Sequence, residues 1–142
     1  ARWAPSAYNG QPWRFIYATK SNTDLWDKLF NPLIEFNQTW VKNAPLIILT
    51  TARKTFEHNG KLNAHNWHDV ATEMGLYVHQ MSGFDFEQVA KNINLPDELE
   101  PVSMIAVGYK GDISVLPEDF QKMENQKRNR KDMKDIVFTK SF

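Results

Sequence analysis

Residues 2–15 read RWAPSAYNGQPWRF, and this run sets how the chain begins to fold. Pro5 and Pro12 bracket a segment whose backbone fits neither a regular helix nor a central strand, because proline fixes φ and lacks an N–H donor. Trp13 and Phe15 are expected to anchor the segment to a hydrophobic core. Three polar residues in it suit hydrogen bonding to a flat heteroaromatic ligand: Ser6, Asn9 and Gln11. The run therefore predicts a polar loop that leads directly into a strand.

The composition excludes several classes of protein. A chain of 142 residues with 42% hydrophobic residues is long enough for one globular domain, expected over residues 1–142. Its formal net charge of zero argues against a nucleic-acid partner, and the absence of cysteine excludes disulfides and thiolate nucleophiles. No apolar run approaches the ~20 residues that span a bilayer, and no signal-peptide pattern is visible. We therefore expect a cytoplasmic protein with no membrane partner.

Hydrophobic periodicity predicts a mixture of strands and helices. Strands are expected over residues 14–20, 45–51, 102–109 and 134–139. The second of these strands is expected to be buried on both faces. Helices are expected over residues 22–36, with a break or kink at Pro32, over 67–81 and over 84–93. Residues 53–66 carry loop chemistry with a turn at Asn59-Gly60. The pattern favours an α+β fold in which a small sheet is flanked by helices.

Two polar motifs lie between the expected elements. Ser82-Gly83 precedes the helix over 84–93, and Asp85 is a candidate N-cap for that helix. One interpretation is a glycine C-cap followed by a capped helix. The other is a ligand site, since glycine lets the backbone approach a planar ligand and donate N–H groups to it. Asn37 is a candidate cap at the C-terminal end of the helix expected over residues 22–36.

The basic run at residues 127–131, KRNRK, also allows two interpretations. It is either a solvated charged surface or a phosphate clamp, because paired arginine forks match phosphate oxygens. A possible metal set at His65, His68 and Asp69 lacks a distant fourth ligand, so no metal site is expected.

Taken together, these motifs resemble the FMN-dependent nitroreductase family. The resemblance lies in A-P-S-x-x-N-x-Q-P-W at residues 4–13, Gly-Phe-Asp at 83–85, a basic-x-Arg pair at 128–130 and the segments 95–102 and 105–109. It implies a nitroreductase-like α/β sandwich with a small, mostly antiparallel sheet. It also implies a homodimer, with a C-terminal extension packed on the partner subunit and two FMN sites at the interface. The FMN contacts implied by the resemblance are Pro5, Ser6, Ala7 and Asn9 of one subunit with Asn37, Ser82, Gly83, Arg128 and Arg130 of the other.

The activity that the resemblance implies is a flavin-dependent oxidoreductase. Hydride would pass from NAD(P)H through flavin N5 to a nitroaromatic or quinone acceptor by a ping-pong mechanism. No catalytic acid or base is assigned, because the flavin carries the chemistry. Compared with the family pattern, this sequence does not contain the N-terminal helix with its Arg-rich motif and holds only part of the central helix, so these segments are either real deletions or residues that this sequence does not include. That difference leaves open a degenerate, non-catalytic flavin-binding or interaction protein. A dehalogenase or flavin-fragmenting relative on the same scaffold would be expected to carry a substrate-covering insertion.

Overall fold

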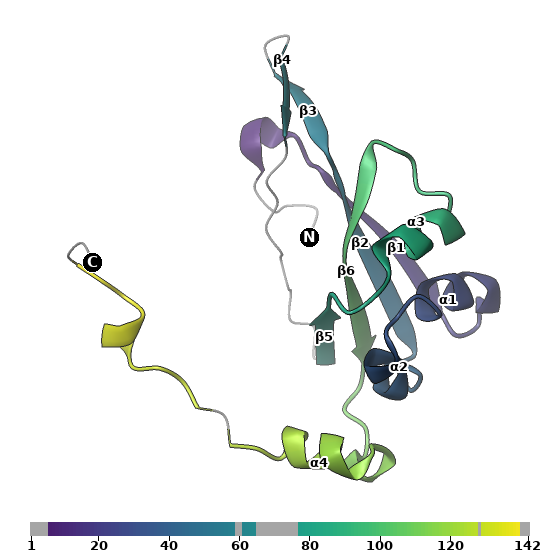
Figure 1. Ribbon diagram of the computed structural model, residues 1–142, viewed down its shortest axis with the longest axis vertical. Coiled ribbons are helices and arrows are strands. Elements are labelled where there is room, and N and C mark those ends of the chain that lie inside the picture. The colour runs from purple at the N-terminus through teal and green to yellow at the C-terminus, as the bar shows by residue number, and fades with distance from the viewer. Residues whose placement is uncertain (1–5, 59–60, 65–76, 128, 140–142) are drawn as a thin grey trace. The chain divides into compact units, whose positions relative to one another are not determined.

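The computed structural model of the protein describes residues 6–58, 61–64, 77–127 and 129–139 (Figure 1). By its internal contacts the chain forms two compact units, Ala1–Lys110 and Gly111–Phe142. The expectation of one domain over residues 1–142 stays a prediction. No helix in the described ranges is long and apolar enough to cross a membrane.

The first unit is built on a four-stranded antiparallel sheet with the strand order β1-β2-β6-β5. These strands are β1 (Trp13–Thr19), β2 (Leu46–Arg53), β5 (Tyr77–Met81) and β6 (Leu99–Gly108). β2 lies inside the sheet, because both of its edges pair with neighbouring strands. The expected burial on both faces is not complete: Ile47 and Leu49 have no exposed surface, whereas Leu46 and Ile48 on the other face are only partly buried. The register of β2 against β6 shifts between Thr50 and Thr51, and Thr51 lies opposite Pro101. Proline inside a strand is tolerated at such an irregularity, where a ladder donor is not needed.

Three short helices accompany this sheet: α1 (Thr23–Phe30), α2 (Glu35–Val41) and α3 (Phe86–Asn92). The helix expected over residues 22–36 is therefore two helices, separated by a connector that contains Pro32. Proline cannot continue the hydrogen-bond ladder of a helix interior, so α1 ends before it. The predicted α+β fold, a small antiparallel sheet flanked by helices, is confirmed.

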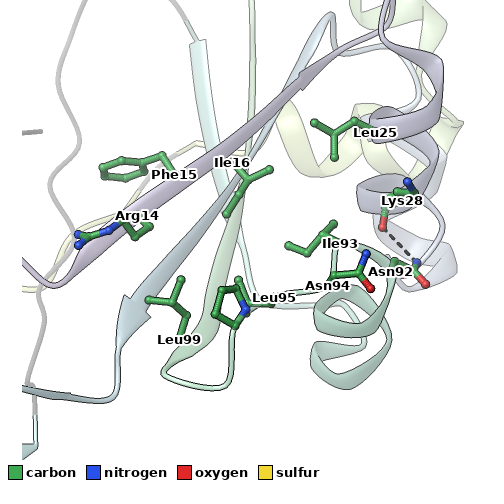
Figure 2. Close-up of a pocket in the computed structure, with 11 residues that line it drawn as sticks. Arg14, Phe15, Ile16, Leu25, Lys28, Asn92, Ile93, Asn94, Leu95 and Leu99 are labelled. Atoms are coloured by element: carbon green, nitrogen blue, oxygen red, sulfur yellow. Dashed lines mark hydrogen bonds between the residues drawn. The ribbon is translucent and has the colours of Figure 1, made fainter.

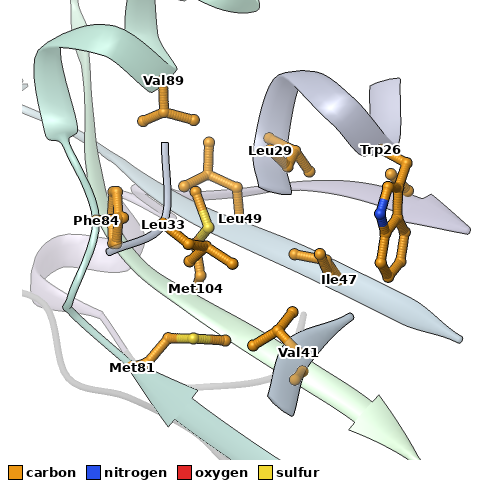
Figure 3. Close-up of a cluster of buried hydrophobic side chains, with 12 residues drawn as sticks. Trp26, Leu29, Leu33, Val41, Ile47, Leu49, Met81, Phe84, Val89 and Met104 are labelled. Atoms are coloured by element: carbon orange, nitrogen blue, oxygen red, sulfur yellow. The ribbon is translucent and has the colours of Figure 1, made fainter. Parts of the chain in front are cut away.

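A hydrophobic core joins α1 and α3 to one face of the sheet (Figure 3). Leu29 of α1, Val89 of α3, Leu49 of β2 and Met104 of β6 are all fully buried in it. Figure 3 shows these side chains directed toward one another from the helices and the strands. Leu33 of the connector between α1 and α2 and Phe84 before α3 also belong to this core, which thereby holds two segments next to the Ser82-Gly83 turn.

The expectation that Phe15 anchors the opening loop to the core is wrong. Side chains alternate between the two faces of a strand, and Ile16 and Ala18 occupy the core-facing positions of β1. Phe15 and Tyr17 consequently lie on the opposite face, where they are 47% and 67% exposed. Pro12, immediately before β1, is the fully buried residue at this end.

Two further expectations of secondary structure are corrected in the first unit. The segment expected as a loop over 53–66 contains an antiparallel hairpin of β3 (Thr55–His58) and β4 (Lys61–Ala64). Asn-Gly is a strong hairpin signal, but its residues lie outside the described ranges. The helix expected over 67–81 is wrong for Tyr77–Met81, which form β5, because pairing with β6 satisfies that backbone. The rest of that expected helix, residues 67–76, lies outside the described residues.

The second unit contains α4 (Glu118–Glu124) and the 3₁₀ helices η2 (Ile113–Val115) and η3 (Met133–Asp135). The Asp112 carboxylate caps η2 and accepts a hydrogen bond from the Ser114 N–H at 2.8 Å. This bond lowers the pKa of Asp112, because it stabilises the charged form. The strand expected over residues 134–139 is absent from the single chain. Within the described part of this unit, no strand offers a pairing edge to these residues.

Candidate functional site

The Ser82-Gly83 turn after β5 is held by the N-terminal part of α2. The Gly83 carbonyl accepts two hydrogen bonds, from the Ile34 backbone N–H at 3.1 Å and from Asn37 Nδ2 at 2.9 Å. Asn37 lies inside α2 and is 7% exposed, so its interpretation as a helix cap is wrong. The structure therefore brings two of the predicted site residues, Asn37 and Gly83, into direct contact.

The orientation of the Gly83 N–H follows from the same turn. The Ser82 carbonyl accepts a hydrogen bond from the Phe84 N–H at 3.0 Å. The C=O and N–H of a planar trans peptide point to opposite sides, so the Gly83 N–H points away from Phe84. No described residue accepts this N–H. The turn thus presents one fixed backbone donor.

Glycine is required at position 83 for space. A Cβ built on Gly83 would lie 2.6 Å from Asn37 Nδ2 and 2.8 Å from Ile34 Cδ1. Both separations are shorter than side chains tolerate, and the first involves a hydrogen-bonded, buried amide. The sequence predicts that a planar ligand approaches this glycine closely, which stays a prediction; the groups close to it in this structure are the side chains of Asn37 and Ile34.

The segment after the turn is anchored to the connector between α1 and α2. Leu33 and Phe84 form an isolated antiparallel bridge, and the Asp85 N–H donates to the Pro32 carbonyl at 2.9 Å. The Asp85 carboxylate then caps α3, as the sequence predicts, and accepts from the Gln88 N–H at 2.9 Å. The turn is therefore fixed on both sides of Gly83.

The contribution of the Asp85 cap to stability can be measured by substitution. Asp85→Ala is expected to lower the free energy of unfolding by about 1 kcal/mol, because the first turn of α3 loses its acceptor. Asp85→Asn retains a capping oxygen and serves as the matched control. Urea denaturation of both variants measures the difference, and equal losses would contradict a capping role.

The opening loop forms the 3₁₀ turn η1 (Ala7–Asn9). Ser6 Oγ accepts the Gln11 backbone N–H at 3.0 Å and closes the loop, which Gln11 also braces through its side chain. Tyr8, Asn9 and Gln11 have φ angles of 50°, 54° and 45°. Left-handed backbone at residues other than glycine is uncommon, and it clusters where loops bind ligands. Pro5 lies outside the described residues.

The arginine pair lies in the second unit. Arg130 is exposed, and its Nη1 donates to the neighbouring Asn129 carbonyl at 3.1 Å. No ion pair involves this guanidinium within the described residues. Arg128 lies outside the described residues.

The two predicted loops of the first unit lie at opposite edges of its sheet (Figure 1). Residues 6–9 precede β1, whereas Ser82 and Gly83 follow β5. Three strand spacings of about 4.8 Å, or about 14 Å in total, separate these edge strands. One copy of the first unit therefore does not bring the opening loop to the Gly83 turn.

A surface pocket of about 420 Å³ lies beside β1, α1 and the segment after α3 (Figure 2). It contains none of the nine predicted site residues. The cations beside it are already engaged: Arg14 donates to the Gln11 and Trp13 carbonyls, and Lys28 pairs with Asp24 at 2.7 Å. We assign no ligand to this pocket.

Metal-ligating side chains do not gather in the described parts of the chain. No group of three or more His, Asp or Glu residues there could hold an ion. His65, His68 and Asp69, the set considered from the sequence, lie outside the described residues.

Comparison with known proteins gives the chain its family. A sequence profile described as "Nitroreductase family" matches residues 1–109, well over half of the 142 residues. The chain belongs to the nitroreductase family. The matched range contains the opening loop, Asn37 and the Gly83 turn of this family member, whereas Arg130 lies beyond it.

Several relatives of this nitroreductase family member have known sequences or structures. A solved structure described as an oxidoreductase containing FMN is 29% identical, with a TM-score of 0.83, and the match covers 99% of this chain and 77% of that one. A nitroreductase family protein from Clostridium difficile is 26% identical, with a TM-score of 0.67, and the match covers 99% and 81%. An uncharacterized 15.4 kDa protein from Mycolicibacterium smegmatis is 32% identical over 69 residues. That match covers 49% of this chain and 46% of the relative, so the chain spans about half of that protein.

Ile34 is a contributor to the site that the sequence analysis did not find. Its backbone N–H binds the Gly83 carbonyl, and its side chain limits the space at Gly83. The available signal is Pro32, which marks a break in the helix but does not indicate which segment pairs with the connector after it.

Proposed function

We propose that this nitroreductase family member binds FMN and is a flavin-dependent oxidoreductase. The observation that carries the proposal is the Gly83 N–H, a fixed backbone donor for which no described residue is an acceptor. Such a donor suits N5 or O4 at the edge of a flavin. The structurally similar oxidoreductase containing FMN, at 29% identity, supports the same cofactor.

We propose that the predicted residues contact FMN at both of its ends. Ser82 and Gly83 would hold the ring, and Arg128 and Arg130 would hold the phosphate through forked, charge-assisted hydrogen bonds. The remaining proposed contacts come from the opening loop: Pro5, Ser6, Ala7 and Asn9. When bound, FMN supplies a ring that accepts hydride at N5 and passes it to an acceptor, while the protein supplies position and hydrogen bonds.

A homodimer is part of the proposal, because the opening loop and the Gly83 turn lie at opposite edges of one sheet. Apolar side chains around the turn support a protein interface there: Ile34 and Phe36 are 51% exposed, and Phe86 is 40% exposed. Ile136, Val137 and Phe138 are more than 50% exposed, and we propose that this C-terminal extension packs on the partner subunit.

The proposed reaction is ping-pong transfer of hydride from NAD(P)H to a nitroaromatic or quinone. Steady-state oxidation of NADH and NADPH with a quinone distinguishes it from the alternative, a non-catalytic flavin-binding or interaction protein. Bound FMN without turnover would favour that alternative. A cytoplasmic location stays a prediction.

The phosphate clamp gives a direct binding test. Purified protein is expected to be yellow or to take up added FMN. Arg130→Ala is expected to weaken FMN binding at least about tenfold, because a hydrogen bond to a charged group contributes about 1.5–3 kcal/mol and each 1.4 kcal/mol is tenfold. Fluorescence titration with FMN and with riboflavin, which lacks the phosphate, measures the effect.

Lys131→Ala is the matched control, since it removes the same charge from the next position. We expect it to change FMN affinity much less than Arg130→Ala does, and we expect riboflavin affinity to be similar in both variants. Colourless protein that takes up no FMN would contradict the proposed function.

A further inference from the structure

We propose that Asn37 is a positioning residue, which directs the Gly83 N–H toward the flavin by holding the Gly83 carbonyl. The inference rests on the proposed FMN function. From the sequence, Asn37 is expected to reach the edge of the flavin itself. In the structure, Asn37 Nδ2 instead donates a hydrogen bond to the Gly83 carbonyl at 2.9 Å.

The side-chain amide of Asn37 is buried. Asn37 is 7% exposed, and a buried amide without a hydrogen-bond partner is destabilising by about 1–3 kcal/mol. The bond to Gly83 is therefore maintained in the folded protein. The residues that it joins are 46 positions apart in the chain, so it links α2 to the turn after β5.

Hydrogen bonds connect the Asn37 side chain to the peptide that contains the Gly83 N–H. A carbonyl oxygen has two lone pairs, and those of Gly83 receive the Ile34 N–H and Asn37 Nδ2. This pair fixes the plane of the Gly83–Phe84 peptide. The Phe84 N–H in that plane donates to the Ser82 carbonyl and thereby fixes the plane of the Ser82–Gly83 peptide, which contains the Gly83 N–H.

Position 83 is occupied by glycine. Glycine is conformationally permissive, so this peptide needs an external restraint to keep one direction. Asn37 also occupies the space that a side chain at position 83 would need, because a Cβ there would lie 2.6 Å from Asn37 Nδ2. Without Asn37, one hydrogen bond from Ile34 is left on the carbonyl and the Gly83 peptide can rotate.

The test compares Asn37→Ala with Gln38→Ala. Gln38 is the matched control because its Nε2 donates to the Leu33 and Asn31 carbonyls, so it braces the same connector without touching Gly83. The measurement is the midpoint reduction potential of FMN bound to the full chain. A donor held at the ring favours the reduced, more electron-rich form, so its misdirection lowers the potential.

We expect Asn37→Ala to lower the ratio of affinities for reduced over oxidised FMN about tenfold, which is about 30 mV for a two-electron couple. Gln38→Ala is expected to leave the potential near that of the wild type. Loss of FMN binding in Asn37→Ala alone, with its far-ultraviolet circular dichroism unchanged, also supports the inference.

A second variant covers the case in which Asn37→Ala does not fold. Asn37→Asp keeps the shape of the side chain and replaces the donor with an acceptor facing the Gly83 carbonyl. We expect it to lower the potential at least as far as the alanine variant does. Unchanged potentials in the Asn37 variants, or an equal shift in Gln38→Ala, would overturn the positioning role while FMN binding stands. Wild-type protein that binds no FMN would instead overturn the proposed function, and the inference with it.

Discussion

Leu49→Ala is expected to lower the free energy of unfolding by about 3 kcal/mol, a large part of the stability of a domain of this size. Leu49 lies in β2, inside the sheet, and has no exposed surface. Its truncation removes buried apolar surface and leaves a cavity among Val89, Met104 and Leu29, which surround it in Figure 3. Urea denaturation followed by tryptophan fluorescence measures the change, with Trp26 reporting from the same core.

Ile48→Ala is the matched control for this prediction. Ile48 is the adjacent residue of β2, points to the other face of the sheet and is only partly buried. Its truncation removes a side chain of similar size, so we expect a loss of about 1 kcal/mol, since less surface returns to water and no closed cavity forms. Similar losses in the two variants would contradict the assignment of the core to the helix-covered face.

Gly83→Ala is expected to lower the free energy of unfolding by about 2 kcal/mol, because the new methyl group overlaps a buried side chain. The clash is with Asn37 Nδ2 at 2.6 Å and with Ile34 Cδ1 at 2.8 Å. Asn37→Ala is expected to be destabilising by a similar amount, since the Gly83 carbonyl loses a donor. The double variant is expected to lose less than the sum by at least about 1 kcal/mol, because alanine at 37 vacates the space that the methyl group needs.

The control for this cycle is Gly83→Ala combined with Gln38→Ala. Gln38 makes no hydrogen bond to Gly83, so the two losses are expected to add. A cycle in which Asn37→Ala and Gly83→Ala also add would show that the two residues are independent. It would remove the structural basis of the positioning role.

Local sequence patterns predicted those parts of the fold that depend on neighbours along the chain. The continuous apolar run at 45–51 indicated a strand inside the sheet, where Ile47 and Leu49 on the helix-covered face are fully buried and Ile48 on the other face is only partly buried. Pro32 indicated the break between α1 and α2, and Asp85 indicated the start of α3. In each case the physical cause lies within a few residues of the signal: a missing donor, a capping oxygen or a run of apolar side chains.

Patterns that depend on distant partners were misread. Tyr77–Met81 was expected to be helical, yet it pairs with β6 more than twenty residues later. Its backbone hydrogen bonds are made to β6, and the hydrophobic periodicity of residues 77–81 does not indicate that this strand lies nearby. Phe15 was expected in the core for a similar reason, because the face of β1 that is covered depends on where α1 packs.

The candidate site divides in the same way. The sequence, together with its family resemblance, predicts the opening loop, Asn37, the Gly83 turn and the late arginines as contacts of a flat, phosphorylated ligand, and this site stays a prediction. The contact of Asn37 with the Gly83 carbonyl came from folding, because a bond across 46 residues exists only when α2 is packed beside the end of β5. Hydrogen bonds and close contacts act over a few ångströms of space, whatever the separation along the chain.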